Sequence, residues 1–191
     1  MKIAICGTIA SGKTEACKII NAKYPVLNCD ELAKKCYQPD HEAYAKILAL
    51  LGNDILTHQQ VDFQKVANII FNDPLKRRQL EAIIHPYVKQ AIMQLDDKIN
   101  FVEIAILFAC GWEDLFDRIV VITCDKNIAL KRMMEDRGYS LKQASERYMS
   151  QLDPQIQIAK ADDVIYNNGT KLQLQQEIDK LLERIVVNDR S

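Results

Sequence analysis

The sequence has little that would favour a metal-binding, membrane-spanning or nucleic-acid-binding protein. Its six cysteines form no C-x-x-C pair and have no histidine at zinc-ligand spacing, so buried free thiols are expected rather than a zinc site. Lysine and arginine number 25 against 26 aspartates and glutamates, so no net positive field attracts nucleic acid or an anionic membrane. The hydrophobic runs are short, because Glu103 divides the best candidate, and none reaches the roughly 18 residues of a membrane span.

These absences also predict where the protein works. Free thiols are typical of reducing compartments. The first apolar run, residues 3–6, ends at Gly7 and is too short for a signal peptide. We therefore expect a soluble, cytoplasmic protein with no nucleic-acid or membrane partner, acting as a monomer or weak homo-oligomer on a small-molecule substrate.

The length and the apolar pattern predict one α/β domain. The chain has 191 residues, which is enough for a single well-filled core and too few for two ordinary domains. Short apolar runs alternate with helical patterns at residues 3–6, 26–27, 101–108, 119–124 and 164–166. This alternation predicts five parallel strands with helices on both faces. Residues 30–99 are interpreted almost wholly as helix, and part of that segment is expected to form a helical lobe.

Several residues mark where helices should begin or end. Asp73 followed by Pro74 predicts an N-cap and a first-turn proline. Thr170 similarly precedes an amphipathic pattern that predicts the final helix. The His85-Pro86 step predicts a helix interruption, because proline disfavours the helical conformation of the residue before it.

The strongest functional signal is a complete G-x-x-x-x-G-K-[ST] motif that follows the first short strand and opens a helix. It consists of Gly7, Thr8, Ile9, Ala10, Ser11, Gly12, Lys13 and Thr14. The glycines let backbone N–H groups approach and surround phosphates, and the helix N-terminus adds positive potential. Lys13 is expected near the β and γ phosphates, and Thr14 offers a hydroxyl to magnesium. The motif therefore predicts ATP and Mg²⁺.

Two carboxylates are candidates for the transfer chemistry. Asp30 follows the second short strand, where ligands of open α/β sheets bind, so it could accept the proton of an attacking hydroxyl and contact the metal. The alternative is that Asp30 is only an N-cap. Glu103 interrupts an apolar strand, where a carboxylate is costly unless paired or near a metal. It either contributes to the magnesium shell or lies at a strand edge facing water.

The segment 126–159 is a candidate lid. It contains Arg132 and Arg137, with Gly138 at an expected helix end. Arginines on a mobile helical pair can close on a nucleotide and stabilise the transferring phosphoryl group. A solvated helical hairpin with ordinary surface charges is the alternative.

Four stretches of the sequence resemble the dephospho-CoA kinase family. They are residues 7–14, 28–33, 80–88 with the His85-Pro86 step, and 161–169, of which the last two are distinctive. The resemblance implies a three-layer P-loop NTPase fold with a five-stranded parallel sheet, a helical substrate-binding insertion and a helical lid. It also implies transfer of the ATP γ-phosphate to the ribose 3′-hydroxyl of dephospho-CoA, the last step of coenzyme A biosynthesis.

The resemblance further implies roles for individual residues and segments. Asp30 matches the catalytic carboxylate, Arg132 and Arg137 match lid arginines, and the turn with Asn168 and Gly169 would lie near the adenine. One kinase domain, residues 1–187, would have its core at about 1–30, 100–125 and 160–187. The CoA-binding region would span about 31–99, the lid about 126–159, and a tail 188–191.

The sequence departs from the family pattern after the third strand. Ala105 and Ala109 stand where the family usually has proline and an acid, and Asn28 replaces an aspartate. The spacing of Arg132 and Arg137 is one residue longer than usual. Two alternatives therefore stay open. One is another P-loop small-molecule or nucleoside kinase, and the other is an ATP-binding regulatory protein with reduced catalysis.

Overall fold

The computed structural model describes residues 1–96 and 98–189, and the chain divides into two compact units. The first unit comprises Met1–Leu27 and Asp96–Ser191, and the second is Asn28–Leu95. The expected tail, 188–191, begins inside the last helix, α10 (Lys171–Asp189), and its final two residues lie outside the described part of the chain. No helix within the described residues has the length and hydropathy needed to cross a membrane.

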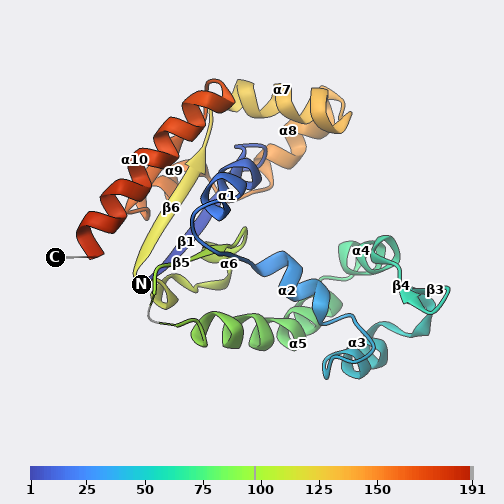
Figure 1. Ribbon diagram of the computed structural model, residues 1–191. Coiled ribbons are helices and arrows are strands. Elements are labelled where there is room, and N and C mark those ends of the chain that lie inside the picture. Colours follow the sequence, from blue (N-terminus) through green and yellow to red (C-terminus); the bar gives the residue numbers. More distant parts are fainter. Residues whose placement is uncertain (97, 190–191) are drawn as a thin grey trace. The chain divides into compact units, whose positions relative to one another are not determined.

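The first unit is built on a five-stranded sheet with the order β2-β5-β1-β6-β7 (Figure 1). The strands are β1 (Lys2–Gly7), β2 (Val26–Asn28), β5 (Asn100–Glu103), β6 (Arg118–Thr123) and β7 (Asp163–Tyr166). β1 pairs in parallel with β5 on one side and β6 on the other, so Ile5 lies opposite both Glu103 and Val120. The prediction of a five-stranded parallel sheet is confirmed.

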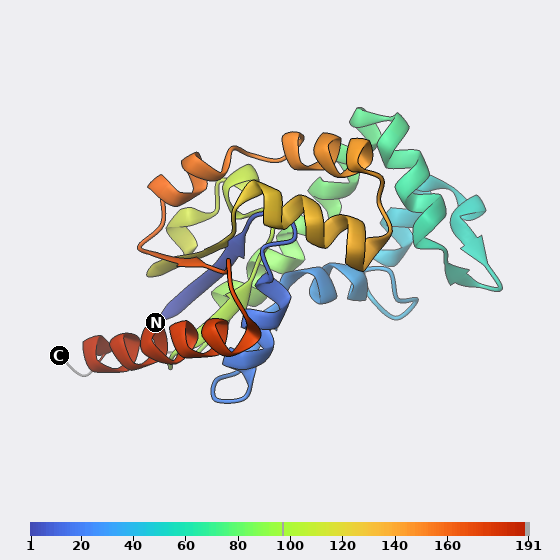
Figure 2. The ribbon, with the colours of Figure 1, turned by 90° about the horizontal axis from the view of Figure 1, so that it is seen from above.

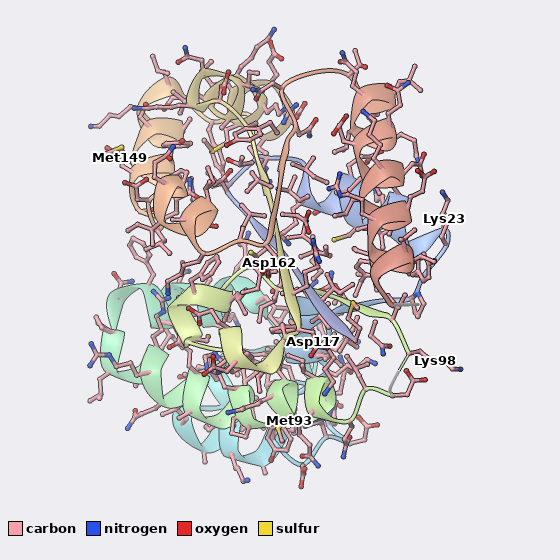
Figure 3. All side chains as sticks on the ribbon, turned by 90° about the vertical axis from the view of Figure 1, so that its left-hand side faces the viewer. Lys23, Met93, Lys98, Asp117, Met149 and Asp162 are labelled. Carbon is pink, nitrogen blue, oxygen red and sulfur yellow. The ribbon has the colours of Figure 1, made fainter. Side chains whose placement is uncertain are left out.

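Helices cover the sheet because its central strands are apolar on both sides. Ile3, Ala4 and Ile5 of β1 are fully buried. α1 (Lys13–Asn21) packs beside α10, and α9 (Pro154–Ala159) packs against β6. Figure 2 shows the sheet between α10 and α9. Next to the contact between α1 and α10, the Lys23 ammonium lies beside α10 (Figure 3) and contacts an oxygen of Asp179 at 2.7 Å.

β5, the third strand of the five-stranded sheet along the chain, is shorter than its apolar run. The sequence predicts a strand over residues 101–108, whereas β5 ends at Glu103 and a short helix, α6 (Leu107–Cys110), follows. The β1–β5 pairing reaches Ile5 and Glu103, and the chain then turns at residues 105–106 into α6, although β1 itself continues to Gly7. A three-residue 3₁₀ helix, η2 (Glu113–Leu115), leads on to β6.

The segment expected to form a lid consists of α7 (Lys126–Arg137), α8 (Leu141–Met149) and α9. α7 ends at Gly138, whose φ of 67° is the left-handed conformation that glycine adopts without steric cost. α8 begins with a capping box, in which Ser140 and Gln143 bond each other's backbone N–H groups. α7 packs against α8, and Met149 extends from α8 with 70% of its surface exposed (Figure 3).

The second unit is mainly helical and is organised around its longest helix, α5 (Pro74–Met93). α2 (Cys29–Lys35), α3 (Tyr44–Leu51) and α4 (Phe63–Asn72) each pack against α5. A 3₁₀ turn, η1 (Asn53–Ile55), follows α3. As predicted, Asp73 caps α5 by accepting the N–H groups of Leu75 and Lys76, and Pro74 occupies the first turn.

The predicted interruption at His85-Pro86 is wrong, because α5 continues through both residues. Proline removes one helical hydrogen bond and crowds the preceding turn. However, Ile84, Val88 and Ile92 are buried along one side of the helix on both sides of the proline. Packing of that stripe keeps the helix continuous, which outweighs the local preference of the dipeptide.

The second unit also contains a small hairpin that the sequence does not predict. β3 (Leu56–Thr57) pairs antiparallel with β4 (Gln60–Val61), and His58 and Gln59 form the turn. Both turn residues have positive φ, 50° and 63°, as a tight two-residue hairpin turn requires. Such turns usually carry Asn-Gly, so His-Gln gave no recognisable signal.

Candidate active site

The G-x-x-x-x-G-K-[ST] motif forms a loop between β1 and α1, which we call the phosphate loop (residues 7–14). Both motif glycines are required by close packing. A Cβ atom on Gly7 would lie 2.1 Å from the carbonyl oxygen of Ile122, and one on Gly12 would lie 2.3 Å from Asn167 Nδ2. Gly12 also has a left-handed φ of 87°. The loop backbone can therefore follow this path only if positions 7 and 12 carry glycine, which has no Cβ atom.

The carbonyl groups of the phosphate loop are held by residues from distant parts of the first unit. Asn167 Nδ2 donates to the carbonyl of Ser11 at 2.8 Å. The Arg132 guanidinium donates to the carbonyl of Ala10 at 3.2 Å and to the carbonyl of Asn167 at 2.9 Å. Ala10 has a φ of 56°, a left-handed conformation that costs a residue with a Cβ about 1–2 kcal/mol. These contacts stabilise the strained loop conformation.

The donors at the start of α1 fit a polyphosphate. The first N–H groups of a helix have no acceptor within the helix, and the helix dipole places positive potential there. The Lys13 ammonium lies 2.5 Å from Glu103 Oε1, and the two side chains are only 15% and 8% exposed. The ammonium is thus held at the end of the loop by a carboxylate from the adjacent strand.

Glu103 is buried, so the alternative that it faces water at a strand edge is wrong. The Cys17 thiol lies close to the same carboxylate. Burial, with a further contribution from Glu103, raises the pKa of Cys17 to about 12. Burial likewise raises the pKa of Cys6 to about 12. Both thiols are therefore neutral at physiological pH, and the expectation of buried free thiols is confirmed for five of the six cysteines.

Asp30 is not the cap of its helix. It is an exposed residue in the first turn of α2. The cap is Asn28, whose Oδ1 accepts the N–H of Glu31 at 3.0 Å. The alternative interpretation of Asp30 as a purely capping residue is therefore wrong, because Asn28 is the residue that caps α2. Asp30 belongs to the second unit, whereas Lys13 and Thr14 belong to the first.

The two candidate lid arginines differ in their surroundings. Arg132 is partly buried and bonded to the phosphate loop. Arg137 is the last residue of α7 and is exposed. A third arginine of this segment, Arg147, lies over the ring of Tyr139, with its guanidinium carbon 4.7 Å from the ring centre. Of these three arginines, Arg132 is the one that donates a hydrogen bond to a loop carbonyl, so it stabilises the loop conformation.

The turn after β7 also reaches the loop region. Asn168 Oδ1 accepts the N–H of Asp125 at 2.8 Å, and Gly169 follows it. Asn167 is the residue of this turn that bonds the phosphate loop itself. Besides Arg132 and Asn167, Gln151 also bonds the loop, accepting the Ile9 N–H through Oε1 at 2.8 Å. The sequence did not single out Gln151, because an isolated glutamine after a helix has no recognisable motif.

The described residues contain no group of three or more His, Cys, Asp or Glu side chains arranged to hold a metal ion. The candidate magnesium ligands are instead spread over both units. Thr14 is an exposed residue of the first turn of α1, Asp30 is on α2, and Glu103 is at the end of β5.

Known proteins are similar to this chain in sequence and fold over nearly its whole length. A family model described as dephospho-CoA kinase matches residues 1–173. The dephospho-CoA kinase of Oceanobacillus iheyensis is 34% identical over 191 residues, which cover 95% of this chain and 96% of the relative. The dephospho-CoA kinase of Geobacillus kaustophilus is 32% identical, with 96% of each chain covered.

A solved structure of a dephospho-CoA kinase is also similar to this chain in fold. The structure of a dephospho-CoA kinase from Campylobacter jejuni matches with a TM-score of 0.74 and 27% identity, covering 99% of this chain and 100% of that one. The phosphate loop, the parallel sheet and the helical second unit all lie within the matched residues. The chain therefore belongs to the dephospho-CoA kinase family.

Proposed function

We propose that the chain transfers the γ-phosphate of ATP to the ribose 3′-hydroxyl of dephospho-CoA. The observation that carries this proposal is the phosphate loop with its buried Lys13–Glu103 pair, within a chain that matches the family from residue 1 to residue 173. The loop supports binding of a nucleotide polyphosphate, and family membership supports the acceptor. The buried neutral thiols support a cytoplasmic location.

In this proposal the first unit holds ATP. The N–H groups at the start of α1 and the Lys13 ammonium bind the β and γ phosphates. Thr14 and Asp30 are the proposed Mg²⁺ ligands, and Glu103 is a further carboxylate for that site. The metal would neutralise charge that develops on the phosphoryl oxygens. Asn168 and Gly169 are proposed to lie beside the adenine.

Three side chains are proposed to act on the transfer itself. Asp30 accepts or orients the proton of the ribose hydroxyl, a role that its exposed carboxylate at the start of α2 supports. Arg132 keeps the phosphate loop in its binding conformation through the Ala10 carbonyl. Arg137, exposed at the end of α7, is the arginine we propose to neutralise the moving phosphoryl group when the lid, residues 126–159, closes.

The second unit is the proposed CoA-binding region, and it contains a hollow of about 480 Å³. This volume lies within the roughly 300–1,000 Å³ of typical ligand pockets. Aromatic and amide side chains dominate its lining: Tyr37, Tyr44, Phe63, Gln38, Gln59 and Gln60. The described lining contains no Asp, Glu, Lys or Arg, and burial raises the pKa of Tyr37 to about 12, so its phenol stays neutral.

The lining also includes His58, but its described residues include no lysine or arginine, so it suits an uncharged ligand better than a phosphate. The pantetheine arm of dephospho-CoA is uncharged and carries amides, a hydroxyl group and a thiol. The hollow offers glutamine side chains for the amides and the rings of Tyr37 and Phe63, which pack edge to face with 5.0 Å between centres. We therefore propose that this hollow binds the pantetheine arm.

One turnover experiment tests the main proposal. The wild-type protein is incubated with Mg-ATP and with dephospho-CoA, a nucleoside or a nucleoside monophosphate, and the phosphorylated products are identified. Dephospho-CoA should be the preferred acceptor and CoA its product. Preference for a nucleoside would contradict the proposed acceptor, and nucleotide binding without phosphorylation of any of these acceptors would contradict the proposed activity.

The Asp30→Asn variant tests the proposed proton acceptor. Asparagine has the same shape and removes the basic carboxylate, so turnover should fall by roughly 100-fold or more. ATP affinity, measured by calorimetry, should stay within roughly a few fold if the phosphates are held chiefly by the loop. Glu31→Gln, one residue further along α2, is the matched control and should retain turnover. Normal turnover in Asp30→Asn would rule out the assigned role.

A further inference from the structure

Two buried polar atoms of the first unit lack a hydrogen-bond partner, and both belong to the phosphate loop or touch it. Across residues 1–96 and 98–189, the buried side-chain polar atoms without a partner are Ser11 Oγ and Gln151 Nε2. Ser11 is in the loop, and Gln151 bonds the loop through Ile9. Leaving a buried donor unsatisfied costs about 1–3 kcal/mol, so such atoms are rare and call for an explanation.

The orientation of the Gln151 carboxamide follows from its bonded end. The Ile9 N–H is a donor, so the carboxamide atom 2.8 Å from it must be the acceptor, Oε1. Exchanging oxygen and nitrogen would place two donors face to face. Nε2 is therefore the unpartnered end, and because the carboxamide is short and planar, Nε2 lies beside the same part of the loop.

The loop context indicates which acceptor suits this donor. Ile9 is in the loop that leads to Lys13, whose expected partners are the β and γ phosphates. Phosphate oxygens are strong acceptors for N–H donors. Gln151 directly follows the end of α8, in the candidate lid, and lies 142 residues from Ile9 in sequence. One carboxamide thus joins the lid segment to the loop while it retains a donor for a ligand.

We propose that Gln151 binds the terminal phosphoryl group of ATP. Oε1 holds the Ile9 N–H, and Nε2 donates to an oxygen of the γ-phosphate. The proposal rests on the proposed function, because it takes ATP as the phosphoryl donor. It makes Gln151 the residue that distinguishes ATP from ADP, and it explains why a buried donor at this position is tolerated.

The variant Gln151→Glu separates this role from a purely structural one. A glutamate has the same shape and keeps an oxygen to accept the Ile9 N–H. A purely structural hydrogen bond between residue 151 and the loop would therefore persist. It replaces the phosphate-facing donor with an anionic acceptor, which would repel the γ-phosphate. Calorimetric titration with ADP and with a non-hydrolysable ATP analogue, both with Mg²⁺, measures the two affinities without any acceptor substrate.

We expect Gln151→Glu to weaken binding of the ATP analogue by about 30-fold and binding of ADP by about threefold, a selective loss of about tenfold. The control is Gln155→Glu, which adds the same charge at an exposed site four residues away. It should weaken both nucleotides equally and slightly. Thermal unfolding of each variant checks the fold, and Gln151→Met, which keeps the packing but removes both polar groups, should show the same loss of ATP selectivity.

An equal effect on both nucleotides in Gln151→Glu, or no effect on either, overturns the inference. So does unchanged selectivity in Gln151→Met. Failure of the proposed function is recognised separately. A wild-type protein that binds nucleotides but does not phosphorylate dephospho-CoA contradicts the proposed function, whereas the role of Gln151 is decided by the two affinities alone.

Discussion

The phosphate loop and the hollow of the second unit are built in different ways. The loop is a run of eight residues, and two of its carbonyls are fixed by Arg132 and Asn167, more than a hundred residues away. The hollow is lined by side chains from residues 37–63, and part of its wall is the hairpin β3–β4, which closes within six residues. Contacts between residues far apart in the sequence define the phosphate loop, whereas local chain geometry defines the hollow.

The difference teaches which changes each region should tolerate. In the proposed function, the loop meets ATP mainly through backbone groups, so any added atom that moves the backbone should remove several donors together. In the hollow, each side chain contributes its own contact, so a single truncation should remove only part of the binding energy. The following predictions test this contrast.

Replacing Gly7 with alanine should have the largest effect. The new Cβ would lie 2.1 Å from the Ile122 carbonyl oxygen, and neither backbone can yield without moving the sheet or the loop. Such overpacking costs about 1–3 kcal/mol of stability. Because the loop donors shift together, ATP affinity should fall by about 100-fold, as measured by calorimetry.

Gly138→Ala is the matched control for Gly7→Ala. Its φ of 67° is also left-handed, but a Cβ there would meet no atom within 4 Å. The substitution should cost about 1 kcal/mol of unfolding free energy through backbone strain alone and leave ATP affinity within roughly twofold. If Gly7→Ala bound ATP as well as Gly138→Ala does, close packing would not be what defines the loop.

Replacing Phe63 with alanine should have an intermediate effect, confined to the acceptor. The side chain lines the hollow and contacts the ring of Tyr37. Because Phe63 is already 46% exposed, only part of its apolar surface is available to the arm, and the KM for dephospho-CoA should rise by about tenfold with little change in kcat. The measurement is steady-state turnover at saturating ATP.

Phe71→Ala provides the comparison on the same helix. Phe71 is 87% exposed and lies outside the lining of the hollow. Its truncation should leave the KM for dephospho-CoA unchanged. Equal behaviour of the two phenylalanine variants would contradict binding of the pantetheine arm in the hollow.

Replacing Ala10 with glycine should have the smallest effect, and it should be stabilising. Removing the Cβ relieves about 1–2 kcal/mol of left-handed strain. The greater freedom of glycine in the unfolded chain offsets about 0.5–1 kcal/mol of this gain. The free energy of unfolding, measured in urea, should therefore rise by about 0.5–1 kcal/mol.

Ala22→Gly is the corresponding control at an ordinary position. Ala22 has a right-handed φ of −69° at the end of α1, so glycine relieves no strain there. Its free energy of unfolding should fall by about 0.5 kcal/mol. A loss of stability in both variants would show that the conformation of Ala10 stores no strain.

The sequence predicted much of the fold because its signals are local and repeated. Short apolar runs such as residues 3–6 and 119–124 favour buried strands, and the Asp73-Pro74 pair favours one helix start. Predictions failed where the apolar pattern or a local preference did not decide the outcome. The apolar run 101–108 does not mark the turn at residues 105–106, where the chain leaves the sheet and enters α6, and α5 continues through Pro86 because the buried stripe packs on both sides.

The sequence by itself determined the phosphate loop, since glycine, lysine and threonine at fixed spacing are what backbone binding of phosphate requires. It also proposed Asp30 from its place after the second strand and the lid arginines from their helical segment, and the family resemblance implied the same roles. Only the tertiary structure could pair Lys13 with Glu103, turn Arg132 and Asn167 onto the loop carbonyls, and bring Gln151 to Ile9. These contacts join residues far apart in the chain, and no local pattern records them because they arise only when the sheet and its helices pack together.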